Sequence, residues 1–161
     1  MGLGFLVLAA ARAARRGADI DEIVKMVEKT KETTGTVFAV NDIQYLRRGG
    51  RINSIQGFFG SVLNLIPIME IHRGPIKPIE RLRTDKRLVS RLLDLVSDRV
   101  GEERPLRLAV LHADAEEKAW ELRSAAQARF EPDELLISEL SPVMGVHIGP
   151  DGLGISYSYG V

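Results

Sequence analysis

The feature that most constrains the fold is a pair of strand-like segments joined by a tight turn. Residues 67–72 and 76–83 both have strand character, and Arg73-Gly74-Pro75 supplies the turn between them. The second segment has an alternating arrangement, with Ile76, Pro78, Glu80 and Leu82 on one side and Lys77, Ile79, Arg81 and Arg83 on the other. A hairpin of this kind favours a mixed or antiparallel sheet over a purely parallel one.

The remaining pattern alternates strands and helices only in part. We expect further strands at 36–40, 106–113, 135–140 and 155–159. We expect helices at 2–16, from Asp19 to a stop at Gly35, briefly after Asn41 or Asp42, at 55–65, from Thr84, and from Asp114 to Phe130. Residues 145–154 are expected to form a glycine-rich turn, preceded by a short helix that Pro142 begins. Together these elements predict a single α/β (α+β) domain over residues 1–161, with a mixed, largely antiparallel sheet covered by helices.

Local signals specify some helix starts. Asp19 and Glu22 have the spacing of a capping box, in which each side chain bonds a free backbone N–H of the first turn. Asp114 and Glu117 have the same spacing, which predicts a second box.

Composition excludes several classes of function. The 161 residues are 45% hydrophobic and 27% charged, which is typical of a globular domain. With 22 basic and 22 acidic residues, the chain has no basic excess to attract nucleic acid. It has no cysteine, and its three histidines lie far apart without zinc-ligand spacing, so we expect neither a metal site nor a cofactor.

The amino-terminal segment is apolar over residues 2–11. A signal peptide carries its positive charges before the apolar run, whereas Arg12, Arg15 and Arg16 follow it here. The run is also too short to cross a bilayer. An alanine-rich helix is the better interpretation, and its abrupt start resembles a chain cut inside a larger protein.

The first segment that could carry chemistry is 45–52, which contains Gly49-Gly50-Arg51. The glycines allow a sharp turn and a close approach of another group to the backbone. The planar guanidinium of Arg51 suits a carboxylate or a phosphate. From spacing alone, a helix end followed by a solvated arginine is favoured, because glycine after a helix is common.

The second segment is 145–152, with His147 between Gly145 and Gly149. Histidine can bind an anion when it is protonated and can donate a hydrogen bond when it is neutral. The glycines match neither a phosphate-binding loop nor a dinucleotide fingerprint. A ligand site and a tight turn with a satisfied histidine are equally compatible with this pattern.

The third segment, 55–69, is apolar. It could line a cavity for an apolar ligand, but a buried core is favoured because apolar runs are usually just buried. Arg81 and Arg83 on the hairpin are, by default, solvated charges.

Taken together, these segments resemble the DegV family. The resemblance rests on Asn41-Asp-Ile-Gln-Tyr-Leu-Arg-Arg-Gly-Gly-Arg-Ile52, on Leu63-Asn-Leu-Ile-Pro-Ile68, on Arg83 after the hairpin, and on Gly145-Val-His-Ile-Gly-Pro150. It covers the whole chain, whose first residues look like the helix that begins the family's second domain.

The resemblance implies a non-catalytic protein of the bacterial cytoplasm that binds a long-chain fatty acid and presents it to a fatty acid kinase. The head group would lie between two domains, near His147, Arg51, Gly145 and Gly149. The acyl tail would occupy a tunnel lined by Ile52, Phe58, Phe59, Leu63, Ile66 and Met69. Arg83 would contact the kinase or the transferred phosphate.

The chain departs from the family pattern in two ways. The first domain, with its carboxylate-binding hydroxyls, is absent, which implies a carboxy-terminal fragment whose exposed domain interface could pair two copies. Ile148 and Asp151 stand where similar proteins usually have Thr and Gly. Either residue could weaken or alter ligand choice.

Two other classes of function stay open. One is an enzyme that acts on a small carboxylated or phosphorylated metabolite through Arg51 and His147, although no nucleophile, metal set or carboxylate pair accompanies them. The other is a dimerising interaction module.

Overall fold

The computed structural model describes residues 1–50 and 65–161. It contains a six-stranded sheet in the order β3-β2-β1-β6-β4-β5. The strands are β1 Thr34–Ala39, β2 Ile66–His72, β3 Ile76–Leu82, β4 Leu106–Ala113, β5 Glu134–Glu139 and β6 Gly152–Tyr159. Neighbouring strands are antiparallel except β4 and β5, which are parallel. The mixed, largely antiparallel sheet predicted from the sequence is therefore confirmed.

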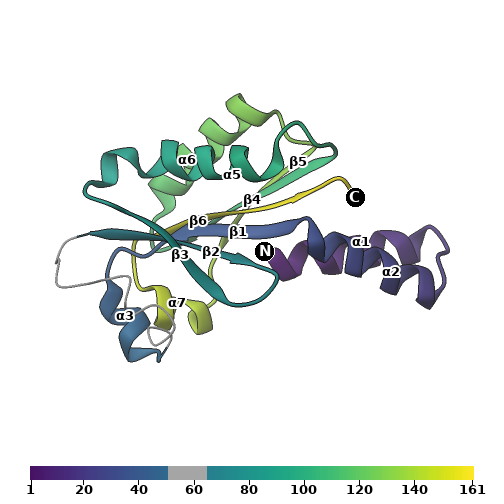
Figure 1. Ribbon diagram of the computed structural model, residues 1–161, viewed down its shortest axis with the longest axis horizontal. Helices are drawn as coiled ribbons and strands as arrows, with labels where there is room; N and C mark the ends of the chain where they lie inside the picture. Colours follow the sequence, from purple (N-terminus) through teal and green to yellow (C-terminus); the bar gives the residue numbers. More distant parts are fainter. Residues whose placement is uncertain (51–64) are drawn as a thin grey trace.

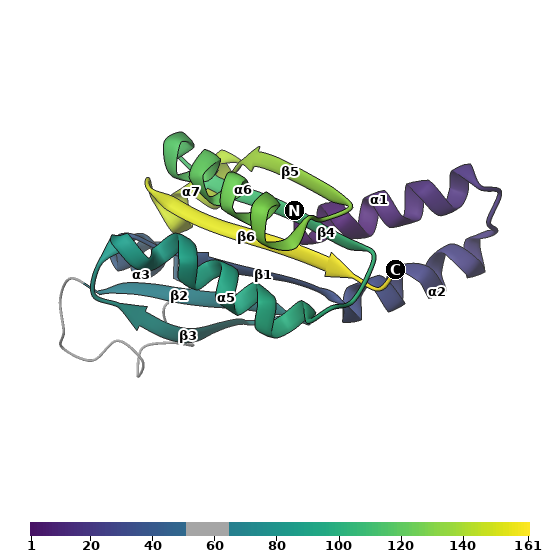
Figure 2. The same cartoon turned by 90° about the horizontal axis from the view of Figure 1, so that it is seen from above.

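The helices of the described residues divide between the two faces of the sheet (Figures 1 and 2). They are α1 Gly2–Arg15, α2 Ile20–Glu32, α3 Ile43–Arg48, α5 Leu88–Val100, α6 Glu116–Phe130 and α7 Pro142–Ile148, with a 3-10 turn at Asp85–Arg87. Helices α5 and α6 cover one face. On the other face, α3 and α7 lie at one end and the α1–α2 hairpin projects from the opposite end (Figure 1).

Two apolar clusters hold these layers together. The larger lies under α5 and α6 and includes Leu92, Leu122 and Ile155, each fully buried. The smaller lies on the opposite face and contains Phe38, Val40, Leu46, Met69 and Ile148. Because β1 is covered on both faces, its consecutive residues Val37, Phe38 and Ala39 are all apolar and buried, without the alternation of a half-buried strand.

The helix end predicted at Gly35 is wrong. Helix α2 ends at Glu32, and Gly35 lies inside β1. A Cβ placed on Gly35 would overlap the Tyr157 ring of the neighbouring strand β6. This glycine therefore serves a close approach between strands and not a helix end.

Of the two predicted capping boxes, one is present and one is not. Asp19 and Glu22 form the expected reciprocal box at the start of α2. At the start of α6 the predicted box is wrong, because the cap residue is Ala115 and makes no side-chain cap bond. Asp114 instead turns the chain with a positive φ of 50°.

The glycine-rich turn is shorter than predicted. Residues expected to open it belong to α7, which runs through Ile148, and β6 already begins at Gly152. His147 consequently lies in the last turn of a helix. The helix expected at 55–65 lies outside the described residues apart from Leu65.

Candidate functional site

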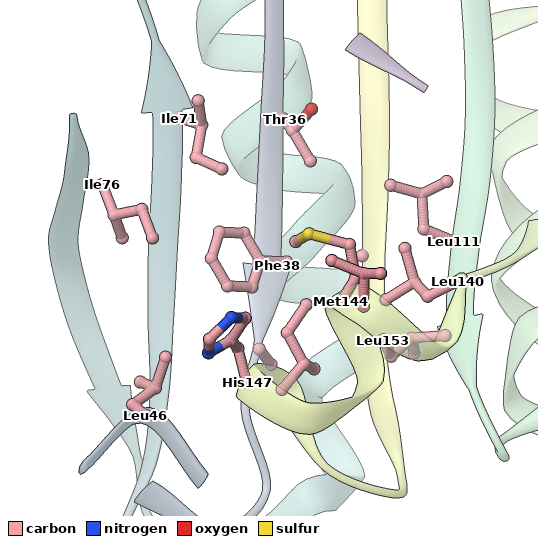
Figure 3. Close-up of a pocket in the computed structure, with 14 residues that line it drawn as sticks. Thr36, Phe38, Leu46, Ile71, Ile76, Leu111, Leu140, Met144, His147 and Leu153 are labelled. Atoms are coloured by element: carbon pink, nitrogen blue, oxygen red, sulfur yellow. The ribbon is translucent and has the colours of Figure 1, made fainter. Parts of the chain in front are cut away.

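A cavity of about 260 Å³ lies on the sheet face that carries α3 and α7. Figure 3 shows its walls: Phe38 on β1, Ile71 and Ile76 on the β2–β3 hairpin, and Leu111 and Leu153 on β4 and β6. Helix α7 contributes Met144 and His147, and α3 contributes Leu46. Among the described lining residues, Thr36 and His147 have polar side chains, so an occupant would meet a mainly apolar wall.

His147 comes close to the backbone of α3. A Cβ placed on Gly49 would lie 2.9 Å from Cε1 of His147 and would overlap its Nδ1. The residue after α3 must therefore be small for the imidazole to occupy this place. Two segments that are about a hundred residues apart in the sequence thus meet through a glycine.

A second glycine contact fixes the same junction. Gly149 has a φ of 77°, and a Cβ there would lie 2.5 Å from Cδ2 of Tyr45 on α3. Both the positive φ and the packed ring favour glycine at this position. Tyr45 and Gly149 thereby hold α7 against α3, which places His147 at the cavity wall.

The Nδ1 atom of His147 is buried and has no hydrogen-bond partner among the described residues. Buried polar atoms are usually paired, so an unpaired one in a cavity wall points to a partner that binds there. Imidazole can donate to or accept from such a partner, according to its protonation state.

The other polar group of the cavity is committed within the sheet. The Thr36 hydroxyl lies 2.7 Å from the hydroxyl of Ser156 on the neighbouring strand. Among the described lining residues, His147 is therefore the one with a buried polar side-chain atom that has no hydrogen-bond partner.

The predicted site residues do not all lie at the cavity. Gly145 belongs to α7, and a Cβ on it would meet nothing within 4 Å, so no close approach depends on it. Ile66 packs against the cluster under α5 and α6, and Met69 is fully buried in the smaller cluster. Neither residue lines the cavity. Arg51, Ile52, Phe58, Phe59 and Leu63 lie outside the described residues.

Arg83 is exposed and directly follows β3. Leu82 pairs with Ile66 at one end of the β2–β3 hairpin, whereas Ile71 and Ile76 line the cavity at the other end. Arg83 is therefore separated from the cavity by the length of a strand.

Sequence reasoning missed most of the apolar wall. Seven apolar residues line the cavity but were not among the predicted site residues: Phe38, Leu46, Ile71, Ile76, Leu111, Leu140 and Met144. Their spacing marks them as apolar faces of strands and helices, and that pattern does not distinguish a packed face from a cavity wall. The apolar pair Val143 and Met144 on the short α7 offered a weak signal.

A partly buried charged network lies on the opposite face of the sheet. Arg99 on α5 donates two hydrogen bonds to Glu70 on β2, at 2.7 and 3.2 Å, and the Tyr157 hydroxyl lies 3.4 Å from the same carboxylate. Burial alone would raise the pKa of Glu70, but the hydrogen bonds and charge of Arg99 outweigh it, and the pKa is lowered. Burial raises the pKa of Tyr157, and the charge of Glu70 adds to that increase. This network ties α5 to the sheet and does not face the cavity.

The described residues offer neither a metal cluster nor a membrane-spanning helix. No group of three or more His, Asp or Glu side chains in them could hold a metal ion. None of the helices in residues 1–50 and 65–161 combines the length and apolarity needed to cross a membrane.

Comparison with known proteins assigns the chain to a family. Residues 1–160 match the model described as "Uncharacterised protein, DegV family". The chain belongs to the DegV family. It is 39% identical over 159 residues to a DegV domain-containing protein of Streptomyces coelicolor, and 36% identical over 157 residues to protein DegV of Bacillus subtilis. The alignments cover 98% and 97% of this chain but 56% of each relative.

Solved DegV structures share the fold. A fatty-acid-binding DegV family protein from Thermus thermophilus superposes with a TM-score of 0.89 at 28% identity, covering 98% of this chain and 57% of that one. DegV from Bacillus subtilis, described as a fatty acid binding protein, superposes with a TM-score of 0.86 at 34% identity, covering 99% and 57%. The chain thus spans slightly more than half the length of these DegV proteins.

Proposed function

We propose that this chain binds a long-chain fatty acid, with part of the acyl tail in the apolar cavity and the carboxylate near His147. The observation that carries the proposal is the unpaired, buried Nδ1 of His147 at the wall of a mainly apolar cavity. An amphiphile with an anionic head is the ligand class that suits both features. DegV relatives described as fatty acid binding support this choice.

The two unusual residues of the His147 segment have different surroundings. Ile148 lines the cavity and is 5% exposed, so it extends the apolar wall. Asp151 is exposed and absent from that wall, and its charge acts on Lys118. We therefore expect Ile148, and not Asp151, to influence ligand choice.

We further propose that the protein catalyses no reaction itself and presents the bound acid to a fatty acid kinase in the bacterial cytoplasm. The part of the DegV length that this chain does not span would complete the head-group site. Exposed Arg83, a strand's length from the cavity, would contact the kinase or the transferred phosphate.

Native and denaturing mass spectrometry of the purified protein tests the central claim. We expect a fatty acid to be released on denaturation, and added saturated acids to bind more tightly as their chains lengthen until the cavity is full. Each buried CH₂ contributes about 0.8 kcal/mol, which sets the slope of that series. Turnover of a soluble metabolite without added kinase, and no retained lipid, would contradict the proposal.

A further inference from the structure

A second cavity, of about 120 Å³, lies at the other end of the same sheet face, beneath the α1–α2 hairpin. It shares no lining residue with the candidate fatty acid site. Its polar walls come from both helices and from β4 and β6, and they include Arg12, Arg16, Arg107 and Ser158.

Three arginines give this cavity an excess of positive charge. Arg12 pairs with Glu134 at 2.8 Å, and Arg107 approaches the same carboxylate at 3.7 Å while donating to the main-chain oxygen of Val161. Arg16 donates a hydrogen bond to the Sδ atom of Met26 at 3.9 Å. Thioether sulfur is a weak acceptor, and Arg16 forms no ion pair with a described residue. One cation remains in excess even when the chain's terminal carboxylate is counted beside Glu134.

A buried hydroxyl faces the same space. Ser158 is 1% exposed, and its Oγ has no hydrogen-bond partner within residues 1–50 and 65–161. Its cross-strand neighbour Thr34 donates to the carbonyl of Thr30 at 2.7 Å, and Thr30 donates to the carbonyl of Met26 at 2.8 Å. The adjacent hydroxyls are therefore occupied, and a buried hydroxyl without a partner points to a bound group.

We propose that this second cavity binds a small oxyanion of the size of inorganic phosphate. Arg16 and Ser158 would donate hydrogen bonds to it. Arg12 and Arg107 would add positive potential while they remain paired with Glu134. Guanidinium groups match the oxygen spacing of such anions, and hydrogen bonds to charged groups are stronger than neutral ones. The proposal does not depend on fatty acid binding.

Titration of the 161-residue chain with inorganic phosphate at constant ionic strength tests this site, by calorimetry and by the thermal unfolding midpoint. Arg16→Gln and Ser158→Ala each remove one proposed donor. Arg15→Gln is the matched control, because Arg15 is exposed, adjacent on α1 and absent from the cavity wall. We expect phosphate to stabilise the parent chain and the control equally, and to bind each donor variant about tenfold more weakly.

Equal weakening in Arg15→Gln and Arg16→Gln would show a general charge effect and would overturn the proposal. Undiminished phosphate affinity in Ser158→Ala would do the same, because the buried hydroxyl would then have no role in binding. Fatty acid retention measured on these variants should stay unchanged. Failure of the anion site is thereby distinguishable from failure of the proposed function.

Discussion

At the scale of single residues, glycines decide where His147 can lie. Gly49 leaves room for its ring, and Gly149 leaves room for Tyr45. Gly145, which lies in the same motif as His147 and Gly149, borders open space. The motif therefore contains glycines of two kinds, which only their surroundings distinguish.

Substitution of His147 tests its role at the head group. His147→Ala should weaken fatty acid binding roughly tenfold or more, because a hydrogen bond to a charged group contributes about 1.5–3 kcal/mol. Binding of the matching fatty alcohol, which lacks the charge, should change much less. Both affinities can be measured by fluorescence displacement. Equal weakening of acid and alcohol would mean that His147 shapes the wall without recognising the head group.

The two kinds of glycine predict opposite effects of alanine. Gly49→Ala should displace the His147 ring and lower fatty acid affinity, with a loss of about 1–3 kcal/mol in unfolding free energy from overpacking. Gly145→Ala should be neutral or stabilising by about 0.5–1 kcal/mol, because alanine suits a helix interior better than glycine. Chemical denaturation and the displacement assay measure both variants. Equal affinities in the two would contradict the contact between Gly49 and His147.

At the scale of elements, the Glu70–Arg99 pair holds helix α5 on strand β2. The Glu70 side chain is 12% exposed, whereas the Arg99 side chain is 39% exposed, so solvent screens part of the interaction. The cluster under α5 supplies the apolar part of this contact, and the ion pair fixes how the helix lies on the strand.

This pair predicts a pH dependence of stability. The pKa of Glu70 is lower in the folded chain than in the unfolded chain, so the pair stabilises the fold above the unfolded value and loses this contribution as the pH falls through the folded value. Glu70→Gln should remove about 1–2 kcal/mol at neutral pH and flatten the acid limb of the stability profile. Urea denaturation between neutral and acidic pH measures both. An identical acid limb in the parent and the variant would contradict the argument.

At the scale of the whole molecule, several large apolar side chains stay exposed. Leu3 and Val7 are 74% and 58% exposed on α1, and Ile20 and Val24 are 72% and 53% exposed on α2. Each pair is spaced four residues apart and so forms a stripe on its helix. The DegV relatives are longer than this chain, and stripes of this kind would be available to contact the rest of such a protein.

We therefore predict that this chain self-associates. Its mass by light scattering should rise with concentration above the 17.8 kDa of one chain, because apolar patches of several hundred Å² are rare on soluble monomers. Leu3→Lys combined with Ile20→Lys should shift the mass toward that of the monomer, whereas changing the exposed Arg15 and Lys25 to Gln should not. A constant monomer mass over a wide concentration range would contradict the prediction.

Sequence alone determined the kind of fold. A tight turn between two strand-like segments required an antiparallel pair, because local backbone geometry and side-chain periodicity are written within a few residues. The motif around His147 also pointed to a segment that lines the cavity. Tertiary structure alone decided that Gly49 receives the imidazole, that Gly35 receives Tyr157, and that Phe38, Ile71 and Leu111 enclose a cavity. These facts depend on which surfaces meet across the sheet, and no short stretch of sequence contains that information.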